Sequence, residues 1–545
     1  MDAAPRQNRQ KAEKAKKSGG GLGWVPSLLS LLTGLLVSLI SLFVYLRTLA
    51  PTVLHYAPKA FPDSVLLQVK AYVLSIPNPT GYPTYILLAH LFTYLPLGDP
   101  AFRVNLASAV FAALAVFTLF MACRKLVGWT LPAAAAALLF GLSQAFWSQA
   151  IITEVYTLNA LTIALVLLAL FTWRERRGGT GGADGSGGAN GDRYLLLTAF
   201  LLGLAVTNHM TSALLIPAAF LFVWIVDRSR LKDLPLVLKG AGLFLLALTP
   251  YIYLPVRARM DPPLNETDPS TPGSFLSLVT GANFDSRMLA FGPLELPGRL
   301  SMYLELLLQQ FSPVFLVVAA VGVGYLAAAD RAALALLGFL YAGWLFYALE
   351  YRIADIYPYF IPTYLVISLL VCAGAFALMD LGAWLVGRYS ARGERPAFYA
   401  VAGLLVAASF LGVRGTYAAV DLSGDYRGQE TIESVEEAVL PDSTVLHSGS
   451  SLWYLREVEQ TRPSLSLVDP FEAGEWESAT GLWAERANYY LDKGPVYVLF
   501  PPGTVQKNVS YFEEAGLSLF LADEKQNLYR VERQEGYEEM PLTSP

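Results

Sequence analysis

Apolar segments of membrane-spanning length recur along residues 24–415 of this chain. A helix needs about 20 mostly apolar residues to cross the hydrocarbon core of a bilayer. Hydrophobic residues make up 54% of the sequence and charged residues 15%, which is too apolar for a soluble protein of this length. The sequence therefore predicts an all-helical, polytopic membrane domain with about eleven spans. The predicted spans are 24–47, 103–123, 131–150, 152–173, 194–208, 210–226, 236–254, 313–329, 332–349, 359–380 and 397–415.

Lysine and arginine are distributed unevenly among the segments that join these spans. If the short, proline-bounded stretch 82–98 does not cross the bilayer, most of the basic clusters fall on one side, which the positive-inside rule assigns to the cytoplasm. We therefore predict a plasma-membrane protein with a basic cytoplasmic tail (1–23) and an external first loop (61–98) that contains two interfacial helices. The glycine-rich stretch 178–191 is predicted to be a flexible cytoplasmic linker. The cytoplasmic clusters are the N-terminus, 124–125, 174–177, 228–239, 331 and 388–395.

The last quarter of the chain has a different composition. From Asp421 onward there are 23 aspartates and glutamates against 9 lysines and arginines. Short apolar runs typical of strands alternate here with amphipathic stretches, which predicts a small α/β domain at 416–545, on the external side. Helices are predicted at 431–440, 451–460 and 476–492, and strands at 444–448, 464–469, 496–500 and as a pair near 517–531.

Polar residues that membrane proteins usually avoid collect at the predicted external ends of the spans. A transporter would be expected to hold such groups near the middle of the bilayer, where its substrate and ion sites lie. Their position at one side instead favours a catalytic site at the outer membrane interface. The residues are Asp63, Asn78, Glu154, His209, Arg257, Asp268, Arg352 and Asp355.

An ordered set of motifs carries a resemblance to a known family. The set is "PDS", "NPTGYPTY", "AFRVNLASAVFAAL", "FWSQAIITEVYTLNAL", "GLAVTNHMTSALLIPA", "YLPVRARMDPPLNETDPSTP" and "YRIADIYPYFIPTYL". Over most of 25–415 the chain resembles the GT-C superfamily of membrane glycosyltransferases. Within it, the sequence is similar to the bacterial relatives of the animal transmembrane protein O-mannosyltransferase family. The resemblance implies a GT-C-type catalytic domain at 24–415.

The same resemblance implies an activity and a set of partners. It implies an inverting glycosyltransferase that moves a sugar from a polyprenyl-phosphate donor to an acceptor hydroxyl at the external membrane face. The acceptor class stays open among protein, lipid and cell-envelope glycan, and the sugar is not indicated. The expected partners are the lipid-linked donor, the hydroxyl acceptor and the bilayer, with no nucleic acid.

Asp63 is the candidate catalytic base, because the family places an acid in the first external loop. A positioned carboxylate can take the proton of an incoming hydroxyl, whereas a lipid phosphate can leave without a general acid. The alternative is that Asp63 is an ordinary N-cap of a helix that begins at Ser64.

Three further residues are candidates for the donor phosphate region, each with a structural alternative. Glu154 precedes a span and could orient the donor, or could simply be a carboxylate favoured at a helix N-terminus. Arg257 can form bidentate contacts with a phosphate as charge develops, or could be an interfacial arginine that extends its charge to water. His209 could bind donor or acceptor, or have a packing role.

A second set is predicted to shape the acceptor side of the site. Tyrosines at a membrane interface can anchor the chain there and can also stack on a sugar ring. Asp355 has a structural alternative, because Arg352 beside it could simply neutralise its charge. The predicted residues are Asn78, Tyr82, Tyr85, Asp355 and Tyr357.

Cofactor use is left open by the sequence. Where relatives carry a glutamate shortly after the catalytic aspartate, this chain has Leu66 and Leu67, so a divalent metal ion is neither assigned nor excluded. Two other functions are weighed against the transferase. A lipid-linked-sugar flippase would need polar groups through the membrane thickness, and a membrane anchor for the α/β domain would leave the external acids and Arg257 unexplained.

Overall fold

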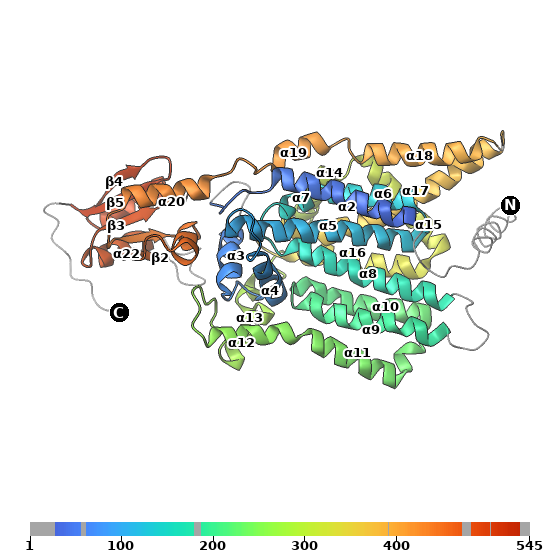
Figure 1. Ribbon diagram of the computed structural model, residues 1–545, viewed down its shortest axis with the longest axis horizontal. Helices are drawn as coiled ribbons and strands as arrows, with labels where there is room; N and C mark the ends of the chain where they lie inside the picture. Colours follow the sequence, from blue (N-terminus) through green and yellow to red (C-terminus); the bar gives the residue numbers. More distant parts are fainter. Residues whose placement is uncertain are drawn as a thin grey trace.

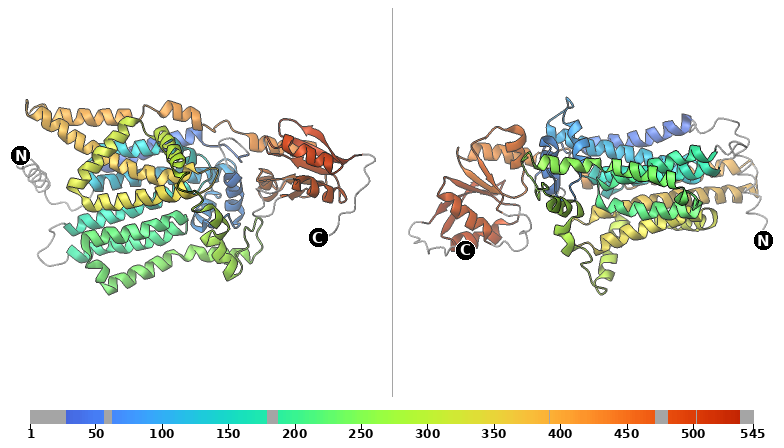
Figure 2. Two further views of the ribbon diagram at one scale, coloured as in Figure 1. Left: turned by 180° about the vertical axis from the view of Figure 1, so that it is seen from behind. Right: turned by 90° about the horizontal axis from the view of Figure 1, so that it is seen from below.

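The computed structural model describes residues 28–55, 62–178, 187–390, 392–470, 481–501 and 503–534. A long helical domain carries a small sheet domain at one end, and the N-terminal helix begins at the opposite end (Figure 1). Two further views show the same separation along the long axis (Figure 2). The predicted tail at 1–23 and residues 179–186 of the predicted linker lie outside the described residues. Residues 187–191 of that linker belong to a helix, so helical structure resumes earlier than predicted.

The helical domain extends from residue 28 to residue 420. Its elements are α2 (Leu28–Thr48), α3 (Pro62–Val73), α4 (Pro83–Phe92), α5 (Pro100–Val127), α6 (Thr130–Gly141), α7 (Gln144–Ala150), α8 (Tyr156–Gly178), α9 (Gly187–Val206), η1 (Met210–Leu214), α10 (Leu215–Asp227), η2 (Arg230–Lys232), α11 (Leu234–Ala247), η3 (Thr249–Ile252), α12 (Tyr253–Ala258), α13 (Pro272–Thr280), η4 (Ala282–Arg287), α14 (Leu296–Gln310), α15 (Pro313–Ala329), α16 (Arg331–Glu350), η5 (Tyr357–Phe360), α17 (Ile361–Gly387), α18 (Glu394–Ala408) and α19 (Val413–Val420). The predicted helical membrane domain is therefore confirmed.

The number of candidate spans is lower than the eleven predicted. Among the described residues, eight helical segments are long and apolar enough to cross a membrane, or ten if each of two bent pairs is counted as one span. The pair α6/α7 bends by 67° and the pair α14/α15 by 103°. The remaining predicted span is α9, whose first turns read "GGANGDR" and make it too polar at that end. Helix α4 has ten residues, about 15 Å of helix, which is too short to cross a bilayer.

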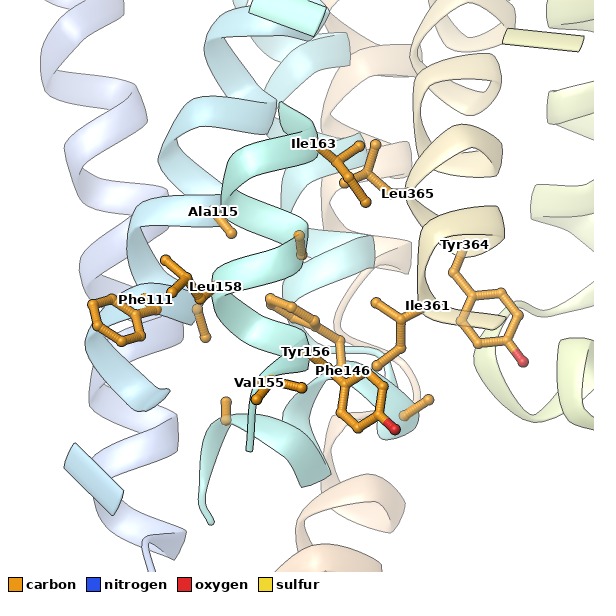
Figure 3. Close-up of a cluster of buried hydrophobic side chains, with 14 of the residues drawn as sticks. Phe111, Ala115, Phe146, Val155, Tyr156, Leu158, Ile163, Ile361, Tyr364 and Leu365 are labelled. Carbon is orange, nitrogen blue, oxygen red and sulfur yellow. The ribbon is translucent and has the colours of Figure 1, made fainter. Parts of the chain in front are cut away.

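The core of the helical domain lies between α5, α8 and α17. Figure 3 shows side chains from these helices and α7, among them Phe111, Phe146 and Leu365, packed into one cluster. Small residues let the neighbouring helices α15 and α17 approach to backbone contact. A Cβ added to Gly322 would lie 1.9 Å from the carbonyl oxygen of Leu370, so no larger residue fits there.

The sheet domain has the predicted α/β character. Its five strands are ordered β2-β1-β3-β5-β4, with β1 parallel to β2 and β3, and with β5 antiparallel to β3 and β4. The strands and most helices match the predicted stretches, while α23 was not predicted. The elements are α20 (Arg427–Ala438), β1 (Thr444–His447), α21 (Leu452–Tyr454), η6 (Leu455–Glu459), β2 (Ser466–Val468), α22 (Leu482–Leu491), β3 (Val496–Leu499), α23 (Val505–Glu514), β4 (Leu517–Asp523) and β5 (Leu528–Arg533).

The sheet domain packs directly on the end of the helical bundle that carries α3. Helices α21 and η6 contact α3, and the hydroxyl of Tyr454 accepts a hydrogen bond from the backbone N–H of Ala101 at 3.4 Å. At Gly428 the two domains touch through their backbones, because an added Cβ would lie 2.1 Å from the carbonyl oxygen of Val53. The C-terminal domain therefore supports the helix that begins with the predicted catalytic acid.

Candidate functional site

Asp63 lies inside the first turn of α3 rather than in front of the helix. Pro62 occupies the first helical position, where its missing N–H has no cost. The Asp63 side chain is exposed, and its Oδ1 accepts a hydrogen bond from Nδ2 of Asn78 at 2.6 Å. Asp63 is therefore a residue of the first helical turn and not the N-cap of a helix that begins at Ser64.

The proline-rich turn is folded back onto α3 by its backbone conformation and by a buried lysine. Gly81 and Tyr82 both have positive φ angles, 89° and 37°, which reverse the chain before α4. Lys70, which is 1% exposed, donates from Nζ to Oδ1 of Asn78 at 2.7 Å and pairs with Glu266 at 3.4 Å. Lys70 thus binds the amide oxygen of Asn78, which turns the amide nitrogen of Asn78 toward Asp63. The sequence analysis missed this role.

Glu154 approaches the same helix from the loop between α7 and α8. It is buried, and its Oε1 accepts a hydrogen bond from the hydroxyl of Ser64 at 2.7 Å. Its backbone N–H donates to Oγ of Ser108 at 3.2 Å, and Ser108 Oγ lies 3.0 Å from the hydroxyl of Tyr85. Tyr85 is fully buried, so it supports the Glu154 loop rather than lining an open acceptor surface as predicted.

The pKa values of three acids in this region are raised. Although the Asp63 side chain reaches solvent, desolvation by the surrounding protein, followed by the negative charge of Asp355, raises the pKa of Asp63 to about 6. Burial and the charge of Asp63 raise the pKa of Glu154 to about 8. Burial also raises the pKa of Asp355. Three carboxyl groups from separate segments are therefore close enough to interact.

An aromatic wall lies beside the acids. The ring of His209 lies 6.2 Å from Tyr82, 5.6 Å from Tyr156 and 5.8 Å from Tyr359, measured between centroids. Its Nδ1 is 2.8 Å from the hydroxyl of Thr211, and burial lowers the pKa of His209 to about 4. His209 is therefore a neutral member of the wall at pH 7.

The wall extends beyond the residues that the sequence analysis selected. Tyr359 also lies 5.2 Å from Tyr351 and 6.3 Å from Tyr347 between ring centroids. Tyr347 and Tyr351 are four residues apart, so they lie on one face at the end of α16, and this spacing was the available sequence signal.

Arg257 occupies a different position from the one predicted. Its Nε donates to the carbonyl of Leu74 at 2.7 Å and its Nη2 to that of Val73 at 3.1 Å. These are carbonyls at the C-terminal end of α3, where a cation is favourable. Arg257 thus holds the far end of the helix that begins with Asp63.

The last predicted pair, Asp355 and Tyr357, separates into two environments. Tyr357 contacts Gln149 through a hydrogen bond of 2.8 Å, whereas Asp355 faces the other acids. Arg352 does not form an ion pair with Asp355 among the described residues. It donates to the carbonyl of Ala290 at 2.6 Å and lies over the ring of Phe291.

Arg287 lies beside the aromatic wall and has no acidic partner among the described residues. Arg287 is joined to this region because the backbone N–H of Arg352 donates to its carbonyl at 2.9 Å. Its positive charge opposes the upward shift that burial imposes on the pKa of Tyr351. Its guanidinium contacts the ring of Phe284 at 5.1 Å. The sequence analysis had not selected Arg287.

No preassembled metal site is present in the part of the chain that the structure describes. No group of three or more histidine, cysteine, aspartate or glutamate side chains there has an arrangement that could hold an ion. Asp63 and Glu154 are instead bonded to Asn78 and Ser64.

The arrangement of the helical domain and the sheet domain is shared with solved structures. It resembles ArnT from Cupriavidus metallidurans, solved with undecaprenyl phosphate, with a TM-score of 0.61, 14% identity and coverage of 91% of this chain and 97% of that one. It also resembles the archaeal oligosaccharyltransferase AglB from Archaeoglobus fulgidus, solved with an inhibitory peptide and a dolichol-phosphate, with a TM-score of 0.53 and 12% identity. That alignment covers 95% of this chain and 76% of AglB. The chain therefore has the same fold as these two solved proteins.

Sequence comparison finds relatives for one part of the chain. Residues 63–232 match the model of the protein O-mannosyl-transferase TMEM260 N-terminal domain. The mouse protein O-mannosyl-transferase TMEM260 is 34% identical over 206 residues, 36% of this chain and 28% of the relative. The Dictyostelium discoideum relative is 23% identical over 288 residues, 50% of this chain and 35% of that protein. The alignments span about a third of these relatives' lengths. The matched domain begins at Asp63 and includes Glu154 and His209.

Proposed function

We propose that this protein is an inverting glycosyltransferase that moves a sugar from a polyprenyl-phosphate carrier to an acceptor hydroxyl. One observation carries the proposal: Asp63, the first residue of the matched family domain, is an exposed carboxylate held by Asn78 rather than by a cation. The names of the relatives make mannose the first sugar to test. The bound lipids of the two structural neighbours make a polyprenyl phosphate the first donor to test.

The proposed reaction is a single displacement. Asp63 accepts the proton of the acceptor hydroxyl while that oxygen forms a bond to the anomeric carbon. The bond from this carbon to the phosphate oxygen breaks, and the polyprenyl phosphate leaves with the electron pair. Attack opposite the leaving group inverts the anomeric configuration. A base whose pKa is about 6 suits this role, because it is ionised at neutral pH and is a better proton acceptor than an unperturbed aspartate.

The neighbouring residues support this step in different ways. Ser64 and Glu154 fix the first turn of α3, and Lys70 fixes the amide that orients Asp63. We assign the donor phosphate to Arg287, since Arg257 donates two of its N–H groups to the end of α3. A guanidinium near developing phosphate charge lowers the barrier by electrostatic stabilisation.

The site is proposed to lie at the external face, with the C-terminal domain on the same side. Single-cysteine labelling can test this orientation in the native chain, because both natural cysteines are buried. Lys525→Cys in the C-terminal domain should react with an impermeant maleimide in intact cells, and Lys232→Cys at the other end of the bundle should react only after permeabilisation. The reverse pattern would overturn the assignment of the site to the external face.

The reaction itself is tested by transfer of radiolabelled sugar with the purified full chain. Mannosyl polyprenyl phosphate and a peptide rich in serine and threonine are the first substrates, with lipid and glycan acceptors in parallel. Labelled product is expected with the natural chain and not with Asp63→Asn. Equal product from Asp63→Asn, or transfer only from a nucleotide sugar, would contradict the proposal.

A further inference from the structure

An apolar groove of about 440 Å³ lies between α9, α10 and α11 and has none of the acids of the site in its lining. Helix α11 packs along α9, while α10 packs against α16, so the two walls diverge from the short element η2 that joins them. Figure 1 shows these helices along the lower edge of the bundle. Helix α11 is an edge helix, with only 6% of its most apolar 18-residue window buried. The groove therefore faces the hydrocarbon of the bilayer.

Small residues set how closely α9 and α11 approach beside the groove. At Gly203 a Cβ would lie 2.5 Å from the carbonyl oxygen of Phe244, so α9 and α11 touch through their backbones there. Toward η2 the contact loosens, since a Cβ added to Gly240 would lie 3.6 Å from that of Ala199. Among the lining residues only Thr198 and Arg230 have side chains with hydrogen-bonding groups. An unfilled apolar space loses dispersion contacts, so a hydrocarbon chain is its natural occupant.

Charged residues surround the η2 end of the groove and carry a net positive charge. Arg177 and Arg230 form ion pairs with Asp192, Asp227 and Asp233. Three further cations at this end have no acidic partner among the described residues. They are Arg193, Arg228 and Lys232, all exposed. The five cations exceed the three aspartates by two charges, which complements a phosphate group.

We infer that this groove binds one acyl chain of an anionic phospholipid, whose phosphate lies against Arg228 and Lys232. Basic residues at the membrane-facing end of helices bind anionic headgroups, each cation contributing a measurable attraction. The groove is apolar along its length and cationic at one end, which matches the two parts of such a lipid. This site is separate from the proposed transfer reaction, whose donor would bind near Arg287.

Native mass spectrometry of the purified full chain in mild detergent tests the inference directly. Phosphatidylglycerol, which is anionic, is titrated in parallel with zwitterionic phosphatidylcholine. One phosphatidylglycerol should be retained per protein at concentrations where phosphatidylcholine is not. Replacing two exposed cations with Arg228→Gln and Lys232→Gln should weaken the binding of phosphatidylglycerol about thirtyfold, because each removed cation costs about fivefold in affinity.

Two glycines on α11 provide a matched pair of variants. They test whether the lipid binds in the groove or elsewhere on the lipid-facing surface. Gly240→Leu places a side chain in the groove, while Gly242→Leu makes the same change where no atom lies within 4 Å of an added Cβ. Retention should fall at least tenfold in Gly240→Leu and stay unchanged in Gly242→Leu. Ala219→Leu on the α10 wall provides a second filling variant if Gly240→Leu does not fold, as judged by circular dichroism.

Three results would overturn the inference. The first is equal retention of phosphatidylglycerol by the filling variants and Gly242→Leu. The second is equal binding of phosphatidylcholine and phosphatidylglycerol. The third is displacement of the lipid by an equimolar amount of undecaprenyl phosphate, which would make the groove a site for the polyprenyl carrier instead.

Discussion

Acids at the two ends of the helical bundle are stabilised in different ways. At the end near η2, carboxylates are paired with cations: Asp330 with Arg174, and Glu175 with Lys125 at 2.6 Å. At the end that carries the C-terminal domain, Asp63 and Glu154 are bonded to neutral side chains instead. A cation beside a carboxylate lowers its pKa, whereas burial and neighbouring acids raise it. Asp63 and Glu154 have raised pKa values, whereas Glu266 at the same end of the bundle pairs with Lys70.

The largest effect is expected from Asp63→Asn, which removes the basic oxygen and keeps the side-chain shape. Loss of a general base should lower turnover by about a hundredfold or more. The thermal midpoint and donor affinity should change little, because Asn78 can still donate to the amide oxygen. Turnover in the radiolabel assay, thermal unfolding and donor binding measure the three quantities.

Asp268→Asn is the matched control for this variant. Asp268 is also bonded to neutral partners, Asn265 and Ser270, each at 3.1 Å, but it is not one of the acids that raise the pKa of Asp63. Its replacement should leave turnover within about twofold of the natural chain. If both variants lost activity equally, a general requirement for negative charge would replace the base assignment.

The pH dependence of turnover should have an acid limb near pH 6. The pKa of Asp63 is raised, so the carboxylate becomes protonated as the pH falls through about 6 and the base is lost. Below this value turnover should fall about tenfold per pH unit, and above it should reach a plateau. An acid limb near pH 4 would mean that the reacting base has an ordinary carboxyl pKa, which would contradict the raised pKa of Asp63.

Two variants should move that limb in opposite directions. Asp355→Asn removes a negative charge that raises the pKa of Asp63, so the limb should move to lower pH. Lys70→Met removes a positive charge that lowers this pKa and releases Asn78, so the limb should move to higher pH. Lys70→Met should also reduce turnover roughly tenfold, because Asp63 loses its orientation. Shifts in the same direction, or none, would show that these groups do not interact with the base.

Much of this fold could be predicted from the sequence because its signals are local. Apolar runs located most spans, and alternating patterns located β1 and the two C-terminal strands. The bend between α6 and α7 was missed, since "GLSQAF" lacks a proline and the run reads as one continuous span. Helix α14 was missed because it is amphipathic and lies at 103° to the span that follows it.

The site was only partly predictable, for a different reason. Asp63, Asn78 and Glu154 could be selected because acids and amides near membrane spans are unusual. The pairing of Lys70 with Glu266 joins residues separated by 196 positions, and only packing brings them together. Arg257 was assigned to a phosphate because side-chain patterns carry no information about backbone acceptors, and its partners are backbone carbonyls.

The smallest effect on activity is expected from Asp330→Ala. This variant tests the role of the ion pairs at the end of the bundle near η2. Asp330 caps α16 by accepting from the N–H of Ala333 at 3.0 Å, and it also pairs with Arg174. Its removal should lower the free energy of unfolding by about 1–2 kcal/mol, from the lost cap and a partly exposed ion pair. Turnover per folded molecule should be unchanged, because the residue belongs to the end of the bundle opposite the site. Comparing thermal unfolding with turnover separates the two outcomes, and a loss of turnover without loss of stability would show that the two ends do not divide stability and catalysis as proposed.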